Sequence, residues 1–364
     1  MKDVLIWGRY GNYGPDYPRN RVIESVLREL GCTVRRFLPA LSATADLEYA
    51  LRRGPRPDLV WVPCFRQRDL AVAARYARRH RLPLVFDPLI SAYDKQVNEK
   101  RKFAADSAQA RKLLAWEARL FNLPDWLIAD TEGHADYFHA THGVPRERIR
   151  VIPVGAEEAL FTPQPWPDKA PDAPLELVFF GTFIGLQGVD VLTQAILQYE
   201  GPPTHWRLIG EGPMKAECER LLASLTRGEG PSQVSFEGWG PLAELPGRLA
   251  SADAILGIFG TSDKALRVIP NKVYQGLAIG RPVITAATPA FPAELRASED
   301  HGLFWARPGD AGSVCAAVGR VHEARRELSK LGRAARARYD AHFSNDVIRA
   351  RLQELLTDAA PHPR

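Results

Sequence analysis

The sequence predicts an α/β protein made of two doubly wound domains that face a central cleft. Short apolar strand patterns alternate with helical patterns along nearly the whole chain, which is typical of parallel sheets covered on both faces. A proline-rich stretch interrupts this alternation once, near the middle. The length of 364 residues also favours two domains over one. In such domains ligands bind beyond the carboxyl ends of the strands, so we expect the site in the cleft.

The first half, residues 1–165, predicts the first domain. Val4–Trp7 is an apolar run that ends at a glycine, and Asn20–Leu30 has apolar residues at helical spacing and stops at Gly31. We expect Pro18 and Arg19 at the start of this helix. Further strands are expected at Thr33–Leu38, Leu59–Pro63, Leu84–Phe86, Trp126–Ala129 and Ile149–Val154.

The second half, residues 174–342, repeats the pattern after a break. Thr162–Pro174 holds five prolines in thirteen residues, which predicts a stiff extended linker. Residues 343–364 include a helical pattern over Ser344–Ala359, and we expect this helix to pack back on the first domain. Strands are expected at Leu175–Phe180, Trp206–Ile209, Val234–Phe236, Ala254–Phe259, Pro282–Thr285 and Gly302–Trp305.

The composition is that of a soluble globular protein, with 45% apolar and 25% charged residues. No apolar run is long enough to span a membrane, the N-terminus is unlike a signal peptide, and four scattered cysteines favour a reducing compartment. Residues 1–170 carry 27 Lys and Arg against 21 Asp and Glu, so the net charge of +5 resides in the first half. This basic half would suit an anionic lipid or substrate. Alternatively, arginines such as Arg78, Arg79 and Arg81 only solvate a helix end.

Three glycine-rich loops follow predicted strands: Gly8–Gly14, Gly181–Gly188 and Gly210–Pro213. Glycines there let backbone N–H groups approach a phosphate or a sugar closely. The first loop lacks the spacing of the dinucleotide fingerprint, and an ordinary glycine turn is an equal alternative. Together the three loops predict a phosphorylated or polyhydroxylated ligand.

The stretch Arg267–Thr285 predicts a basic loop, a short helix and a buried strand. Pro270 suits the helix start, and Gly280 suits its end. Lys272 then lies in the first turn, where a cation opposes the helix dipole unless an anion binds in front of it. The alternative is a surface loop with ordinary helix punctuation.

Six motifs occur in a specific order and spacing. They are Ile152–Ala156 with Phe161, Phe180–Gly188, Ile209–Pro213, Val234–Trp239, Pro270–Ile284 and Ala293–Leu295. With them the chain resembles, over nearly its whole length, the retaining glycosyltransferases of family 4, the group 1 glycosyltransferases with the GT-B fold.

The resemblance implies a nucleotide-diphosphate sugar held mainly by the second domain and a glycan, lipid-linked or small-molecule acceptor held mainly by the first. It implies hexosyl transfer with retention of anomeric configuration, without a metal or other cofactor, and the chain has no Asp-x-Asp triplet. We expect a cytoplasmic protein of polysaccharide or cell-envelope biosynthesis, in peripheral contact with the inner face of an anionic membrane, and no nucleic-acid partner.

Two departures from the family concern the donor. Thr182 and Gln187 stand where relatives often carry an arginine and a lysine that grip the diphosphate, and the Glu-x7-Glu pair maps to Arg267 and Gln275. A leaving diphosphate needs cationic or dipolar stabilisation, so we assign Lys272 and Arg267 as catalytic. Asp87, in the segment of the first domain where relatives often place a histidine, is the third catalytic candidate. The donor-binding candidates are Gly181, Thr182, Gln187, Gly210, Glu211, Lys264, Asn271, Gln275 and Glu294.

On the acceptor side, Phe86–Asp94 ends a strand and has no histidine, although relatives often place one there. Its polar candidates include Asp87, Ser91, Tyr93 and Asp94, and a helix N-cap is the alternative role for Asp94. The acceptor-binding candidates are Gly11, Asn12, Tyr13, Arg19, Tyr93 and Asp94.

The remaining candidates are three histidines and four arginines. His134, His139 and His142 share no metal-ligand face, so we expect a solvated helix and no metal site. We place Arg9, Arg19, Arg66 and Arg68 at strand ends or loops that face a membrane.

Two other functions are alternatives: a sugar-nucleotide epimerase, and a non-catalytic sugar-nucleotide or nucleic-acid binder. An epimerase would need carboxylates or histidines around the sugar, which Gln275 and Thr182 do not supply. The sequence has no interleaved aromatic and basic stripe of the kind that single-strand binders use. An inactive relative was a further alternative.

Overall fold

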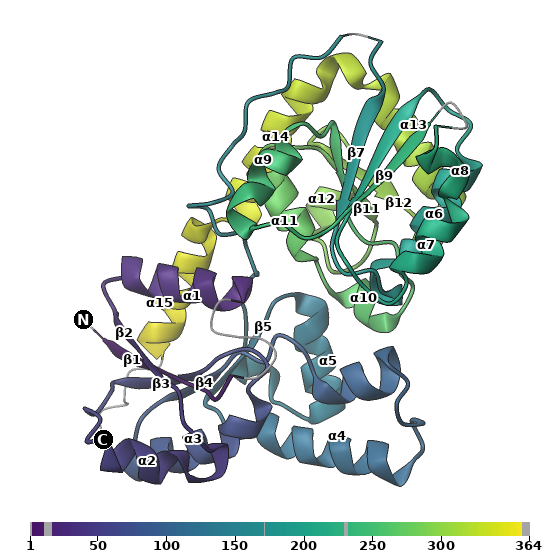
Figure 1. Ribbon diagram of the computed structural model, residues 1–364. Coiled ribbons are helices and arrows are strands. Elements are labelled where there is room, and N and C mark those ends of the chain that lie inside the picture. Colours follow the sequence, from purple (N-terminus) through teal and green to yellow (C-terminus); the bar gives the residue numbers. More distant parts are fainter. Residues whose placement is uncertain (1, 11–16, 171, 229–231, 359–364) are drawn as a thin grey trace. The chain divides into compact units, whose positions relative to one another are not determined.

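The computed structural model describes residues 2–10, 17–170, 172–228 and 232–358, and the chain divides into two compact units (Figure 1). Residues 1–155 and 345–364 form the first unit, and residues 156–344 form the second. Each unit holds a six-stranded, all-parallel sheet with helices on both faces, so the predicted fold class is confirmed. Residues 156–165, which we had placed in the first domain, belong to the second unit.

The first sheet has the strand order β2-β1-β3-β4-β5-β6. Its central strands β3, β4 and β5 are apolar because both faces are covered, whereas the edge strand β2 carries Arg35 and Arg36. Helices α1 and α15 cover one face, and α2, α3, α4 and α5 cover the other (Figure 1). The bounds are β1 Asp3–Trp7, α1 Pro18–Glu29, β2 Thr33–Phe37, α2 Ala45–Leu51, β3 Leu59–Val62, α3 Gln67–His80, β4 Leu84–Phe86, α4 Ala108–Phe121, β5 Trp126–Ala129, α5 Glu132–His142, β6 Ile149–Val151 and α15 Asn345–Asp358.

Helix α15 belongs to the first unit although it ends the described chain. Its apolar side chains Ile348 and Leu352 pack in the core under α1. Two ion pairs fasten it: Arg349 with Glu29 of α1 at 2.5 Å, and Asp358 with Arg150 at 3.0 Å.

The second sheet has the order β12-β11-β10-β7-β8-β9. Helices α6, α7 and α13 cover one face, and α9, α11 and α14 lie on the other (Figure 1). The bounds are β7 Leu175–Phe180, α6 Val189–Gln198, β8 Thr204–Ile209, α7 Lys215–Leu221, α8 Ala223–Thr226, β9 Gln233–Glu237, α9 Leu245–Ala250, β10 Ala254–Leu256, α10 Asp263–Arg267, α11 Asn271–Ala278, β11 Val283–Ala286, α12 Ala293–Arg296, β12 Leu303–Ala306, α13 Ala311–Glu323 and α14 Leu328–His342.

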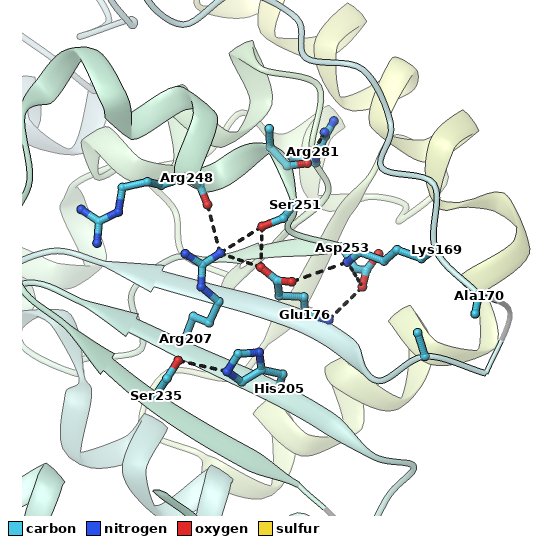
Figure 2. A network of polar contacts seen from close by, with 12 residues as sticks. Lys169, Ala170, Glu176, His205, Arg207, Ser235, Arg248, Ser251, Asp253 and Arg281 are labelled. Carbon is cyan, nitrogen blue, oxygen red and sulfur yellow. Dashed lines mark hydrogen bonds and ion pairs between the residues drawn. The ribbon is translucent and has the colours of Figure 1, made fainter.

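The proline-rich segment is extended, but it is docked on the second unit and is not a free linker. Buried Arg281 donates from Nη1 to the carbonyl of Gln164 at 3.2 Å and from Nη2 to the carbonyl of Pro165 at 2.5 Å. Lys169 donates to Asp253 at 2.9 Å, and the same carboxylate accepts the backbone N–H of Glu176 at 2.8 Å (Figure 2). Arg281 and Asp253 therefore tie this segment to the second unit.

A polar network lies on the sheet face beside α9 (Figure 2). Arg207 of β8 donates to Glu176 of β7 at 2.6 Å and to Glu237 of β9 at 2.8 Å, so it joins three adjacent strands. Ser251 and the carbonyl of Arg248 accept further bonds from Arg207. These contacts satisfy the charged groups under α9, which is why this face tolerates them.

Across the described ranges, no helix is long and apolar enough to cross a membrane.

Candidate functional site

In the second unit, three loops meet at the carboxyl edge of the sheet. The strand order reverses between β7 and β10, which is where ligands bind in open α/β sheets. A Cβ added at Gly188, after β7, would lie 2.5 Å from the backbone nitrogen of Gly260, after β10. A Cβ at Gly210, after β8, would lie 2.0 Å from the carbonyl oxygen of Gly181. Any side chain at Gly210 would therefore separate the loops.

Lys272 points to this meeting of loops. Pro270 is the N-cap of α11, Lys272 is the second residue of the helix, and Gly280 lies just past its end with φ +75°, as predicted. The side chain is only 4% exposed. Its Nζ donates to Gln187 Oε1 at 2.7 Å, and a Cβ at Gly181 would lie 2.9 Å from this nitrogen. The structure thus brings Lys272, Gln187 and Gly181 together.

The Lys272 amine contacts an aromatic ring as well as Gln187. Its Nζ lies 3.5 Å from the centroid of the Phe179 ring. Among the described residues, Lys272 forms no ion pair with a carboxylate. Burial lowers the pKa of Lys272 well below its usual value, because a buried ammonium loses its hydration. An anion bound at these loops would supply the missing counter-charge.

The other donor candidates take different positions. Gln275 is buried on α11, three residues after Lys272 and hence on the same side of the helix, and Asn271 is the first residue of α11. Lys264 is buried in the first turn of α10, and Arg267 ends that helix. Thr182 is exposed in the loop after β7.

Two acidic donor candidates already have partners in the second unit. Glu211 is exposed and accepts from Lys215 at 2.8 Å. Glu294, in the first turn of α12, is exposed and lies 3.7 Å from Nδ1 of His342. No contact joins these two residues to Lys272.

In the first unit, a buried ion pair lies at the carboxyl edge of the sheet. Asp87 directly follows β4, and Arg19 is the second residue of α1. Arg19 Nε donates to Asp87 Oδ2 at 2.7 Å, and Nη1 donates to the carbonyl of Pro153. Arg19 Nη2 has no hydrogen-bond partner among the described residues. Burial raises the pKa of Asp87, although the positive charge of Arg19 opposes this rise.

A second pair lies beside it, and its residues are not among the site candidates that the sequence motifs identify. Asp130 directly follows β5, and its carboxylate bonds Nδ1 of His134 on α5. Asp87 and Asp130 directly follow the neighbouring strands β4 and β5, and the Asp130 charge also raises the pKa of Asp87. A signal was present in the sequence, because both aspartates follow strands that proved to be neighbours.

The predicted solvated helix for the three histidines is wrong. His134 and His142 are buried because α5 packs this face against the sheet, and only His139 is exposed. Burial lowers the pKa of His142 to about 4, so it is neutral at physiological pH. Among the described residues, no group of three or more His, Cys, Asp or Glu side chains could hold a metal ion.

Glu117 of α4 fixes the loop after β4, although no sequence motif identifies this residue. Its buried carboxylate accepts the Ser91 hydroxyl and the Ala92 N–H, each at 2.5 Å, and the Tyr93 N–H at 2.9 Å. Buried Asp94 is the first residue of a short π-helix, Asp94–Glu99, and Tyr93 is its N-cap, so the cap role considered for Asp94 is wrong. Gly11, Asn12 and Tyr13 lie outside the described residues.

Of the four arginines expected at strand ends or loops, Arg9 follows β1 and Arg66 lies in the loop before α3. Arg19 lies at the start of α1, as expected, but it is fully buried and therefore does not face a membrane. Arg68 is exposed in the first turn of α3 rather than in a loop. Arg66 lies over the Tyr10 ring at 5.5 Å and donates to the carbonyl of exposed Arg9.

Comparison with known proteins gives two family matches. Residues 3–155 match the "Glycosyl transferase 4-like domain", and residues 174–324 match "Glycosyl transferases group 1". The chain is 28% identical over 220 residues to the putative colanic acid biosynthesis glycosyltransferase WcaL of Escherichia coli K12, and 27% identical over 221 residues to the amylovoran biosynthesis glycosyltransferase AmsK of Erwinia amylovora. Each alignment covers 59% of this chain, and the chain spans about half the length of these relatives, 52% in both cases.

Solved structures share the fold over nearly the whole chain. Anabaena HepE in complex with UDP superposes with a TM-score of 0.71 at 16% identity, covering 98% of this chain and 100% of that one. Sucrose-phosphate synthase of Thermosynechococcus elongatus gives 0.70 at 16% identity, covering 98% and 99%. Both likenesses establish the two-domain GT-B architecture.

Proposed function

Because the chain belongs to the group 1 glycosyltransferases, we propose that it transfers a hexosyl group from a nucleoside-diphosphate sugar to an acceptor in polysaccharide or cell-envelope biosynthesis. The relatives named for colanic acid and amylovoran biosynthesis support a glycan or lipid-linked acceptor. The UDP found in the HepE structure supports a nucleoside diphosphate as the leaving group. The observation that carries the proposal is the buried Lys272, which has no carboxylate partner among the described residues, at the meeting of the glycine loops.

The donor diphosphate would bind where the loops after β7 and β8 approach the N-terminus of α11. Backbone N–H groups and the helix dipole favour an anion there, and Lys272 supplies the full charge. This cation would stabilise the diphosphate most as the bond to the sugar breaks and negative charge develops. Lys272 would thus replace the charges that Thr182 and Gln187 do not provide.

Asp87 and Arg19 would act on the acceptor side as a pair. Both side chains are buried, so the pair would hold the surrounding loops in position, and Asp87 would orient the guanidinium of Arg19. The unpartnered Nη2 of Arg19 is the group with remaining capacity to donate. Asp130 with His134, and Glu117 beneath the loop after β4, would hold this edge rigid. We further propose transfer with retention, without a metal or other cofactor, at the cytoplasmic face of a membrane.

A thermal-shift screen tests the donor half of this proposal. A ligand that binds only the folded protein raises its melting temperature, so UDP, GDP, ADP and dTDP are compared at equal concentration. We expect one of them to give the largest shift, with no change when EDTA is added. Absence of a shift with all four would contradict the assigned donor site.

Release of the nucleoside diphosphate tests the transfer itself. With the matching sugar nucleotide, release should depend on an added glycan or lipid-linked acceptor, and NMR of the product should show the donor's anomeric configuration. Release without any dependence on acceptor would indicate hydrolysis. Conversion of the sugar nucleotide without release would indicate an epimerase, and the inverted anomer would refute retention.

A further inference from the structure

Helix α2 carries apolar residues on two opposite sides. Ala45 and Tyr49, one turn apart, are buried against the core of the first unit. Leu47 and Leu51, also one turn apart, point the other way and are 60% and 84% exposed. The segment before the helix adds Leu38 and Leu41, which are 48% and 57% exposed. We call these four residues the leucine patch.

The leucine patch is a concentration of exposed apolar surface. The described residues contain eight exposed large apolar side chains, and half of them lie within residues 38–51. Scattered exposed leucines are ordinary, whereas a cluster on one element marks an interaction surface.

Fixed contacts hold the leucine patch in place. The backbone N–H of Ala40 donates to Glu48 of α2 at 2.9 Å, which brings the segment before the helix alongside it. Asp46 pairs with Arg75 of α3 at 2.7 Å, and Glu48 pairs with Arg52 at 2.5 Å. The acidic side chains of α2 are therefore engaged by arginines and do not leave free negative charge beside the leucines.

Six exposed arginines lie next to the leucine patch. Three of them lie within five residues after α2, and the other three lie at or just past the end of α3. Arg56 Nη2 donates to the carbonyl of His80 at 2.8 Å, which joins the two groups. Figure 1 shows α2 and α3 side by side on the same side of the first sheet, in agreement with their packing. We call this set the arginine cluster: Arg52, Arg53, Arg56, Arg78, Arg79 and Arg81.

We propose that the leucine patch and the arginine cluster form a docking surface for an anionic phospholipid bilayer. Leucines would enter the interface between headgroups and acyl chains, while arginines meet the phosphates. The charge argues for this occupant, because five of the six arginines form no ion pair among the described residues and can meet phosphates, whereas Arg52 is already paired with Glu48. The inference rests on the proposed function only in that a lipid-linked acceptor would give the docking a purpose.

The expected effects follow from these two contributions. Each basic residue near an anionic surface adds about 1 kcal/mol, which is roughly a fivefold change in affinity. Removing three arginines should therefore weaken vesicle binding by about 100-fold at low salt. Two exposed leucines that insert into the interface should together be worth at least about tenfold.

The test is sedimentation of the full chain with vesicles of phosphatidylcholine alone or mixed with phosphatidylglycerol. Leu47→Ser/Leu51→Ser and Arg53→Ser/Arg78→Ser/Arg79→Ser remove the two contributions. Leu197→Ser/Leu221→Ser is the matched control, since these leucines are exposed on α6 and α7 of the second unit. Arg66→Ser/Arg68→Ser tests the other end of α3, about 16 Å away along the helix.

We expect the wild type to bind only vesicles that contain phosphatidylglycerol and to lose binding as salt rises. The leucine-patch and arginine-cluster variants should show the stated losses, and the Leu197/Leu221 and Arg66/Arg68 variants should change little. Binding that ignores lipid charge, or equal binding by the leucine variant, overturns the proposal. So does a wild-type dimer that the leucine variant converts to a monomer without vesicles. The thermal shift with nucleoside diphosphate is measured on every variant: if it is retained while vesicle binding fails, the docking surface is wrong and the donor site stands.

Discussion

Replacing Lys272 with methionine should weaken nucleoside-diphosphate binding and also stabilise the nucleotide-free protein. Lys272 is buried, with its Nζ 2.7 Å from the neutral amide of Gln187 and 3.5 Å from the centroid of the Phe179 ring. Methionine keeps a similar length, packs well against an aromatic ring and carries no charge to desolvate. The residue is thus expected to cost stability in the free protein and to serve ligand binding.

The loss of affinity can be sized from the contact that is removed. A hydrogen bond to a charged group contributes about 1.5–3 kcal/mol, which corresponds to about a 10- to 150-fold increase in Kd. A bound diphosphate would favour the charged lysine and raise its pKa again. Binding to the wild type should therefore take up a proton above the lowered pKa and weaken as pH rises, and the methionine variant should lack this dependence.

The stability change has a definite sign with pH. The pKa of Lys272 is lowered in the folded protein, so between that value and its ordinary value the unfolded chain binds the extra proton. Wild-type stability should therefore rise with pH through this window. The advantage of Lys272→Met should be largest below the lowered pKa and vanish near the ordinary lysine value.

Isothermal titration with the nucleoside diphosphate at several pH values, with urea unfolding of the free protein, measures both effects. Lys330→Met is the matched control, because Lys330 is exposed on α14 and pairs only with Glu327 at the surface. An unchanged Kd in Lys272→Met would refute the assigned diphosphate contact. A variant less stable than the wild type at neutral pH would refute the desolvation argument.

Three further predictions concern the two sheet edges and the docked proline segment. Asp87→Asn should destabilise the first unit by about 3–5 kcal/mol in urea unfolding, because it leaves the buried Arg19 without its counter-ion. The double variant with Arg19→Met should recover much of the lost stability, and a double variant as unstable as Asp87→Asn would argue against the pair. Gly210→Ala should abolish the nucleotide thermal shift, because its Cβ would meet the Gly181 carbonyl at 2.0 Å. The control Gly319→Ala, with open space around it, should retain the shift, and equal shifts in both variants would show that the loops need not touch. Arg281→Met should expose residues 162–173 to limited proteolysis, because two carbonyls of this segment lose their hydrogen-bond donor. An unchanged digestion pattern would mean that other contacts are enough to hold the segment on the second unit.

The sequence by itself determined the secondary structure closely. Strand patterns predicted Trp126–Ala129, Leu175–Phe180 and Leu84–Phe86 with the observed bounds, and Pro270 and Gly280 marked the ends of α11. These features are local: apolar periodicity and the backbone restrictions of proline and glycine act within a few residues. Alternation of strands and helices then fixed the parallel sheets, because parallel strands need a crossover connection.

Tertiary structure alone decided which side chains meet. Arg19 and Asp87 are 68 residues apart, and Lys272 and Gln187 are 85 apart, so no local pattern could pair them. Arg19 and Asp87 meet because α1 starts where β4 ends in the first sheet. Lys272 and Gln187 meet because β10 lies beside β7 in the second sheet. The same holds for His134, whose burial depends on the face that α5 turns to the sheet, and for Leu47 and Leu51, whose exposure depends on how α2 packs. Sequence periodicity gives an element its apolar faces, but only the packed sheet decides which of them is covered.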